Sequence, residues 1–104
     1  MSKSILCDEE DQKCFICGKR GVVNIHHIMS GVSNRKNSEE DGLKIYLCPN
    51  CHADIHDRGK VFISKWQYIT ESDIKAFGQR KWEETYGTRE EFIKRYGKSW
   101  IMED

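Results

Sequence analysis

The sequence predicts a small α+β domain that is fastened by a bound metal ion and followed by a helical C-terminal extension. Residues 14–57 hold two C-x2-C pairs and every histidine, whereas residues 58–104 hold neither residue type and show helical punctuation. With 38% hydrophobic and 33% charged residues, the 104-residue chain can build only a thin core, which a bound ion would supplement. We therefore expect a polar N-terminal tail over residues 1–13, the metal domain over 14–57, and an extension over 58–104 that packs on it.

The paired cysteines predict a structural zinc site. Cys14 and Cys17 form one pair, and Cys48 and Cys51 form the other. Two thiolates at this spacing wrap one ion from a tight turn, and two such turns close a tetrahedral shell with no open position. Disulfides are the alternative, but they need an oxidising compartment that nothing in the sequence suggests. Cys7 has no partner at this spacing, so we expect a free thiol on the tail.

The four histidines are candidates for a second metal site. His26 and His27 are adjacent, after a short apolar, strand-like run, so they point to opposite faces of a strand or converge at a bend. His52 and His56 are four residues apart. If a helix starts at Cys51, both project from one face, one turn apart, which is the geometry that chelates one ion.

Two familiar alternatives fit this arrangement poorly. A C2H2 zinc finger is not supported, because His26 and His27 follow Cys17 too closely. A redox enzyme with a C-x-x-C motif is not supported either, because there are two such pairs and no βαβ pattern.

The last third of the chain predicts two helices. The first has its N-cap within residues 70–73 and ends at Gly87, and the second starts with a capping box of Thr88 and Glu91 and ends at Gly97. We interpret the aromatic residues at helical spacing as core that packs over the metal domain. A nucleic-acid stacking surface and a dimer interface are the alternatives.

The charge balance bears on partners and location. The 17 basic residues match the 17 acidic ones, which argues mildly against tight nonspecific DNA binding and requires any basic face to be local. No segment is long enough for a membrane helix, and residues 1–7 lack the apolar stretch of a signal peptide. We therefore expect a cytoplasmic protein without a membrane partner, and a solvated acidic run at residues 8–11.

These residues together resemble a known family. The HNH endonuclease motif of the zinc-stapled, treble-clef (ββα-metal) kind is similar to the pattern Cys14-x-x-Cys17, His26-His27-Ile28 and Leu47-Cys48-x-x-Cys51-His52-x-x-x-His56. The segment 33–43 and the tail through Tyr96-Gly97-Lys98 also resemble small HNH proteins of bacteriophages and prophages. The motif covers residues 14–57, and the phage-type likeness, which is less specific, extends over most of the chain.

The resemblance implies a metal-dependent DNA endonuclease that hydrolyses phosphodiester bonds, with roles for each histidine. His26, His52 and His56 match the ligands of a catalytic divalent ion, which is Mg²⁺, Mn²⁺, Ni²⁺ or Zn²⁺. His27 matches the general base that activates water. The family has an asparagine that orients this base on the strand before the second cysteine pair. Residues 41–47 contain no asparagine, so we expect Asp41 to replace it, with Asn34 or Asn37 as alternatives.

DNA contacts are expected from basic residues around these motifs. Arg35 and Lys36 form the centre of the segment between the histidine pair and the second cysteine pair, with Lys44 nearby. Arg58 follows His56 and is placed to meet a phosphate, so Arg35 and Arg58 are also candidate catalytic residues. Such contacts position the backbone and carry little sequence information, which favours nicking over restriction specificity.

Two rival functions remain open. One is a noncatalytic zinc module that binds DNA or protein, with the histidines forming a second closed structural site. The other is a subunit that cuts only within a larger phage packaging or recombination complex. A homodimer is a further candidate assembly. The four histidines favour an enzyme, whereas the missing asparagine and the zero net charge favour the noncatalytic module.

Overall fold

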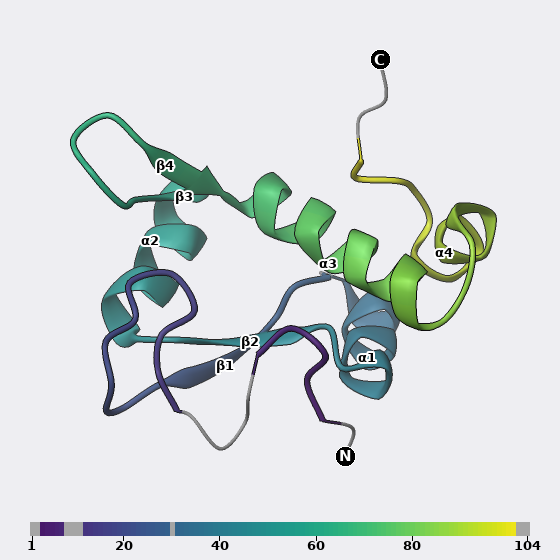
Figure 1. Cartoon of the computed structure of the whole chain (residues 1–104), viewed down its shortest axis with the longest axis horizontal. Coiled ribbons are helices and arrows are strands. Elements are labelled where there is room, and N and C mark those ends of the chain that lie inside the picture. The colour runs from purple at the N-terminus through teal and green to yellow at the C-terminus, as the bar shows by residue number, and fades with distance from the viewer. Residues whose placement is uncertain (1–2, 8–11, 30, 102–104) are drawn as a thin grey trace.

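The computed structural model describes residues 3–7, 12–29 and 31–101. These residues form four helices and two small antiparallel sheets, which confirms the expected α+β class (Figure 1). In chain order the elements are β1 (Asn24–His27), α1 (Val32–Asp41), β2 (Lys44–Leu47), α2 (Pro49–Arg58), β3 (Lys60–Phe62), β4 (Tyr68–Thr70), α3 (Glu71–Thr85) and α4 (Arg89–Tyr96).

The part of the fold that carries the paired cysteines and the histidines consists of the turn at residues 14–17 together with β1, β2 and α2. β1 pairs antiparallel with β2, so that His26 lies opposite Ile45. α2 begins at Pro49, two residues before the expected start at Cys51. Proline suits the first turn of a helix, where its missing N–H leaves no hydrogen bond unmade. The Cys48 sulfur accepts a hydrogen bond from the Cys51 backbone N–H and serves as the N-cap.

α1 fills the connection between β1 and β2. It ends at Gly42, which adopts a left-handed conformation (φ 75°) and returns its N–H to the carbonyls of Ser38 and Glu39. The first described residues pack on this turn: the Ile5 N–H donates to the Gly42 carbonyl (2.9 Å), and Ile5 packs against the core. The expectation of a solvated tail is therefore wrong for residues 3–7, whereas the acidic run at 8–11 lies outside the described residues.

The C-terminal extension begins with a hairpin, so the helical prediction for residues 58–104 is wrong at its start. β3 and β4 pair antiparallel, with Val61 opposite Ile69 and Phe62 opposite Tyr68. These β-branched and aromatic side chains favour a strand, and they flank the turn at residues 63–67. Beyond the hairpin, α3 has its N-cap at Thr70, within the predicted range, and α4 begins with the predicted capping box at Thr88.

One hydrophobic core joins the metal domain to the extension. α3 lies across β1 and β2 in Figure 1, and its Gly78 leaves space for the side chain of Ile28. Trp82, Phe92 and Tyr96 are buried in this core, as the core interpretation of the helical aromatics expects, whereas Tyr86 is half exposed. Within the described ranges, no helix combines the length and the apolar character that crossing a bilayer requires.

Asp41 ties the extension to α1. Its carboxylate accepts hydrogen bonds from Trp82 Nε1 (2.8 Å), Tyr96 Oη (2.7 Å) and both Nε (2.6 Å) and Nη2 (2.9 Å) of Arg95. Burial and the neighbouring Asp41 carboxylate raise the pKa of Tyr96, so its hydroxyl keeps the proton that it donates. Asp41 is thus the common acceptor for donors from α3 and α4.

Replacing Asp41 with alanine should destabilise the protein by about 3 kcal/mol, because it leaves buried donors and the Arg95 guanidinium without their acceptor. The free energy of unfolding from urea denaturation measures this effect. Glu40→Ala is the matched control: Glu40 is exposed and also contacts Arg95 (3.0 Å), and its loss should cost less than about 1 kcal/mol. Equal losses in the two variants would contradict the role assigned to Asp41.

Candidate metal centres

The two cysteine pairs converge on one point. The sulfur atoms of Cys14, Cys17, Cys48 and Cys51 all lie within 4.8 Å of one another. Each pair forms a turn in which the backbone N–H of its second cysteine approaches the sulfur of its first at 3.5 Å. The first turn is joined to β2 by a hydrogen bond from the Phe15 N–H to a β2 carbonyl (2.8 Å).

The geometry of this cysteine cluster fits zinc. Sulfur atoms on a tetrahedral zinc ion stand about 3.8 Å apart, because each Zn–S bond is about 2.3 Å. The Cys17 and Cys48 sulfurs are 3.8 Å apart. Burial raises the pKa of the Cys14 thiol, but hydrogen bonds from the backbone of Cys17, Cys48 and Ile16 outweigh it and lower that pKa to about 7. The four thiols could therefore hold one zinc ion, and Cys7 is not part of the cluster.

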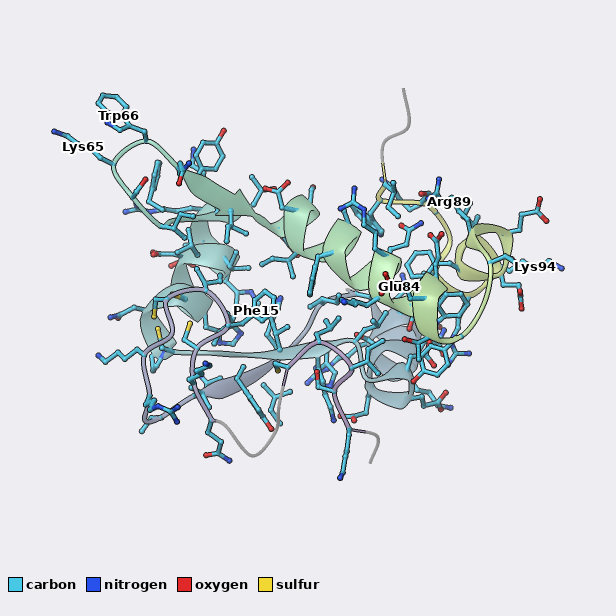
Figure 2. The ribbon with its side chains drawn as sticks, in the orientation of Figure 1. Phe15, Lys65, Trp66, Glu84, Arg89 and Lys94 are labelled. Atoms are coloured by element: carbon cyan, nitrogen blue, oxygen red, sulfur yellow. The ribbon has the colours of Figure 1, made fainter. Side chains whose placement is uncertain are left out.

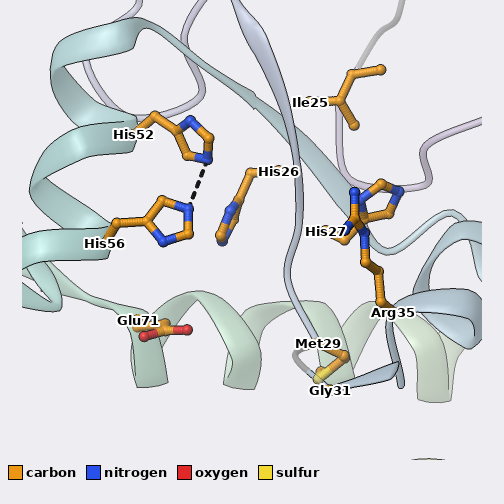
Figure 3. A pocket seen from close by; sticks show the side chains of 9 residues that line it. All are labelled: Ile25, His26, His27, Met29, Gly31, Arg35, His52, His56 and Glu71. Atoms are coloured by element: carbon orange, nitrogen blue, oxygen red, sulfur yellow. Dashed lines mark hydrogen bonds between the residues drawn. The ribbon is translucent and has the colours of Figure 1, made fainter. Parts of the chain in front are cut away.

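Three of the four histidines also converge. The ring nitrogens that His26, His52 and His56 offer lie within 4.8 Å of one another. Figure 3 shows His26 pointing from β1 toward His52 and His56, which project from successive turns of α2. Nε2 of His52 and Nε2 of His56 are 3.1 Å apart. Two imidazole nitrogens bound to one ion at about 2.0–2.1 Å stand about 3.0–3.4 Å apart, so this spacing suits a shared ligand shell.

His26 gives a second indication of a metal site. Its Nε2 is buried and has no hydrogen-bond partner among the described residues, which is costly unless another group satisfies it. Burial, followed by the nearby His52 and His56, lowers the pKa of His26 to about 4. Burial and His56 also lower the pKa of His52. Both rings are therefore neutral near pH 7 and can offer a lone pair to a cation.

The histidine cluster opens to solvent on one side. A pocket of about 400 Å³ is lined by all four histidines together with Ile25, Met29, Gly31, Arg35 and Glu71. His26 is buried, whereas His56 is exposed. An ion held by these three rings would therefore keep coordination positions that face the pocket, unlike an ion enclosed by four thiols.

His27 takes a different role from the other three histidines. As its neighbour on a strand, it leaves β1 on the opposite side from His26 and lies beside Arg35 (Figure 3). Its Nε2 is 3.0 Å from Oε1 of Glu39 on α1. The other oxygen of Glu39 accepts a hydrogen bond from the buried Lys44 ammonium at 2.6 Å.

This contact favours one tautomer of the neutral His27 ring. Lys44, and then His27, lower the pKa of Glu39, so its carboxylate is ionised at neutral pH. An ionised carboxylate only accepts hydrogen bonds, so the shared proton belongs to His27 Nε2. The other ring nitrogen, Nδ1, then carries the lone pair that a general base needs.

None of the residues that we expected to orient His27 contacts its ring. Asp41 does not serve His27, because its carboxylate is occupied by α3 and α4. The amides of Asn34 and Asn37 donate instead to the carbonyls of Tyr96 and Arg95, at the end of α4. Glu39 makes the contact with His27 Nε2 instead. The sequence contains no local signal for this role of Glu39 beyond a run of three acidic residues at 39–41.

The expected DNA-contacting residues separate into two groups. Arg35 and Lys36 are exposed and line a second depression with His27 and Glu39. Lys44 is buried against Glu39, with only 4% of its side chain exposed, so its assignment as a DNA contact is wrong. Arg58 is exposed in the last turn of α2 but is not among the residues that line the histidine pocket.

Comparisons with protein-family models, curated proteins and solved structures return no match. The assignment of function therefore rests on the geometry of the two clusters.

We expect one tightly held zinc ion per chain, which depends on the cysteine cluster alone. Cys48→Ser should remove that ion and unfold the domain, since zinc binding and folding are coupled at such sites. His26→Ala and Cys7→Ser, the latter a matched cysteine control, should each retain it. Elemental analysis by mass spectrometry measures the content, and loss of zinc in Cys7→Ser or its retention in Cys48→Ser would contradict the assignment.

Proposed function

We propose that this protein is a metal-dependent DNA endonuclease of the HNH, treble-clef (ββα-metal) type that nicks phosphodiester bonds. The observation that supports the proposal is that one pocket holds histidine rings in two different environments. The ring nitrogens of three histidines lie close enough to bind one ion, and the ring of His27 contacts Glu39 through Nε2. The order of β1, β2 and α2 beside a four-cysteine cluster supports the treble-clef assignment.

The residues of the pocket suit each part of phosphodiester hydrolysis. A divalent ion, when bound by His26, His52 and His56, would supply positive charge to the phosphate and to the leaving 3′ oxygen. His27 takes a proton from the attacking water at Nδ1, while Glu39 stabilises the imidazolium that results. Arg35, which lines the pocket beside His27, binds a non-bridging phosphate oxygen and orients the strand.

The alternative is a noncatalytic zinc module, and the zero net charge of the chain favours it. In that function the three histidines form a second closed structural site. The exposure of His56 and the pocket beside it favour the nuclease, because a structural site has no use for an open coordination position.

Purified protein should nick supercoiled plasmid in the presence of Mg²⁺, Mn²⁺, Ni²⁺ or Zn²⁺, and His27→Ala should slow nicking about 10²- to 10⁴-fold because the base is lost. Gel separation of supercoiled and open circular forms measures the rate. Lys94→Ala, an exposed substitution on α4, is the control and should nick at the parent rate. Unchanged cleavage by His27→Ala would refute the mechanism, and no cleavage with any of the four metals would favour the noncatalytic module.

Glu39→Gln should slow nicking about 10- to 100-fold, because an amide can donate to Nε2 and stabilise the wrong tautomer of His27. Glu40→Gln, the neighbouring carboxylate on α1, is the matched control and should leave the rate unchanged. Lys44→Met preserves the bond between Glu39 and His27, so it should retain more activity than Glu39→Gln. If Glu39→Gln folds and nicks like the parent, Glu39 does not position the base.

A further inference from the structure

The hairpin formed by β3 and β4 has a composition unlike the rest of the chain. Residues 58–70 contain Arg58, Lys60 and Lys65 and no acidic residue, whereas the whole chain is neutral. The same stretch carries aromatic side chains at Phe62, Trp66 and Tyr68, each at least half exposed. Basic and aromatic residues together are the combination that binds single-stranded nucleic acid.

The two faces of the hairpin differ in chemistry. Val61 is buried and Ile69 is half-buried, so this face packs on the core. On the other face, the rings of Phe62 and Tyr68 form a cross-strand pair with centroids 5.5 Å apart. The Lys60 ammonium lies 5.5 Å from the Phe62 centroid and 5.1 Å from the Tyr68 centroid. This outer face therefore presents two ring surfaces with a cation between them.

The tip of the hairpin presents a third ring in a defined position. Trp66 is 85% exposed and extends away from the body of the molecule beside Lys65 (Figure 2). The Ser64 hydroxyl accepts hydrogen bonds from the backbone N–H groups of Trp66 (3.3 Å) and Gln67 (3.1 Å). The turn is thus held by its own hydrogen bonds, which reduces the entropy that a bound base would have to offset.

The hairpin is continuous with the elements that carry the histidine pocket. It leaves α2 at Gly59 and enters α3 at Glu71, a pocket residue whose N–H donates to the Gly59 carbonyl (2.9 Å). A strand rises about 3.3 Å per residue, so four residues place the tip on the order of 13 Å from the end of α2. One DNA strand can therefore contact the hairpin and the pocket together.

We propose that the β3–β4 hairpin binds single-stranded DNA, with bases stacking on Phe62, Trp66 and Tyr68 and phosphates meeting Arg58, Lys60 and Lys65. This inference rests on the proposed nuclease function, which makes DNA the partner of an adjoining surface. It implies that the enzyme prefers unpaired or distorted DNA near the cut, because stacking needs bases that have left the duplex. An anionic membrane is the rival partner for this face, and phosphatidylserine vesicles distinguish it from DNA.

The test measures DNA binding without cleavage. The His27→Ala protein, with its structural zinc retained and no other divalent ion added, is titrated into a labelled oligothymidylate of about 20 nucleotides and followed by fluorescence anisotropy. A second probe of equal length is abasic, so it has the same phosphates but nothing to stack. We expect tighter binding to the thymidylate than to the abasic strand.

Two substitutions separate stacking from charge. Trp66→Ala should raise the Kd for thymidylate about 5- to 150-fold and leave the Kd for the abasic strand nearly unchanged. Lys65→Ala should raise the Kd for both probes and reduce the salt slope by about one. Ile93→Ala and Lys94→Ala are the matched controls, because these exposed residues lie on α4, and Lys94 is at the opposite end of the molecule from Lys65 (Figure 2).

Three outcomes would overturn the hairpin proposal. The first is equal affinity of the protein for the two probes. The second is a Trp66→Ala variant that binds thymidylate as tightly as the parent. The third is binding to phosphatidylserine vesicles that is lost in Trp66→Ala and that added thymidylate does not displace. The failure of the nuclease proposal looks different: the parent binds thymidylate through Trp66 yet nicks no plasmid with any metal. Conversely, if nicking requires His27 but Trp66→Ala binds DNA like the parent, the nuclease proposal stands and the hairpin proposal is contradicted.

Discussion

The structure depends on the convergence of two short turns, residues 14–17 and 48–51, whose sulfur atoms meet at one point. The intervening chain would pay a large entropy cost to close this loop without a strong link, and the apolar core of this small chain is thin. Cys14, Cys48 and Cys51 are buried within that core, so the link belongs to the packing rather than to the surface. Burial and the neighbouring thiols raise the pKa of Cys51, so a bound cation would favour the ionised form of that thiol.

This link places the histidines. The second turn caps α2, which fixes the rotation of the helix and turns His52 and His56 toward β1. The first turn is bonded to β2, which pairs with β1 and so sets the position of His26. Adjacent strand residues face opposite ways, and His27 therefore meets α1 and Glu39 instead of joining the cluster. One local constraint thus yields both a ligand set and a separate base.

Features with a local chemical signal could be predicted from the sequence, whereas features set by helix phase could not. The cysteine spacing, the histidines one turn apart and the capping box at Thr88 each depend on residues within one or two turns. Glu39 contacts His27 in place of the expected Asp41 because α1 is a continuous helix. Residues two apart on such a helix lie about 200° apart around its axis. Glu39 then faces β1 and Asp41 faces α3 and α4. The β3–β4 hairpin was missed because its strands are only three residues long.

We propose that this chain holds two chemically distinct metal centres, one closed and one open. Anomalous X-ray diffraction from crystals of the protein grown with Zn²⁺ or Ni²⁺ tests it most directly. The account predicts one ion among the four cysteine sulfurs. It predicts a second ion bound by His26, His52 and His56, with water in its remaining positions and the His27 ring unbound. A second ion with His27 in a saturated shell, or no ion between the three imidazoles, would contradict it.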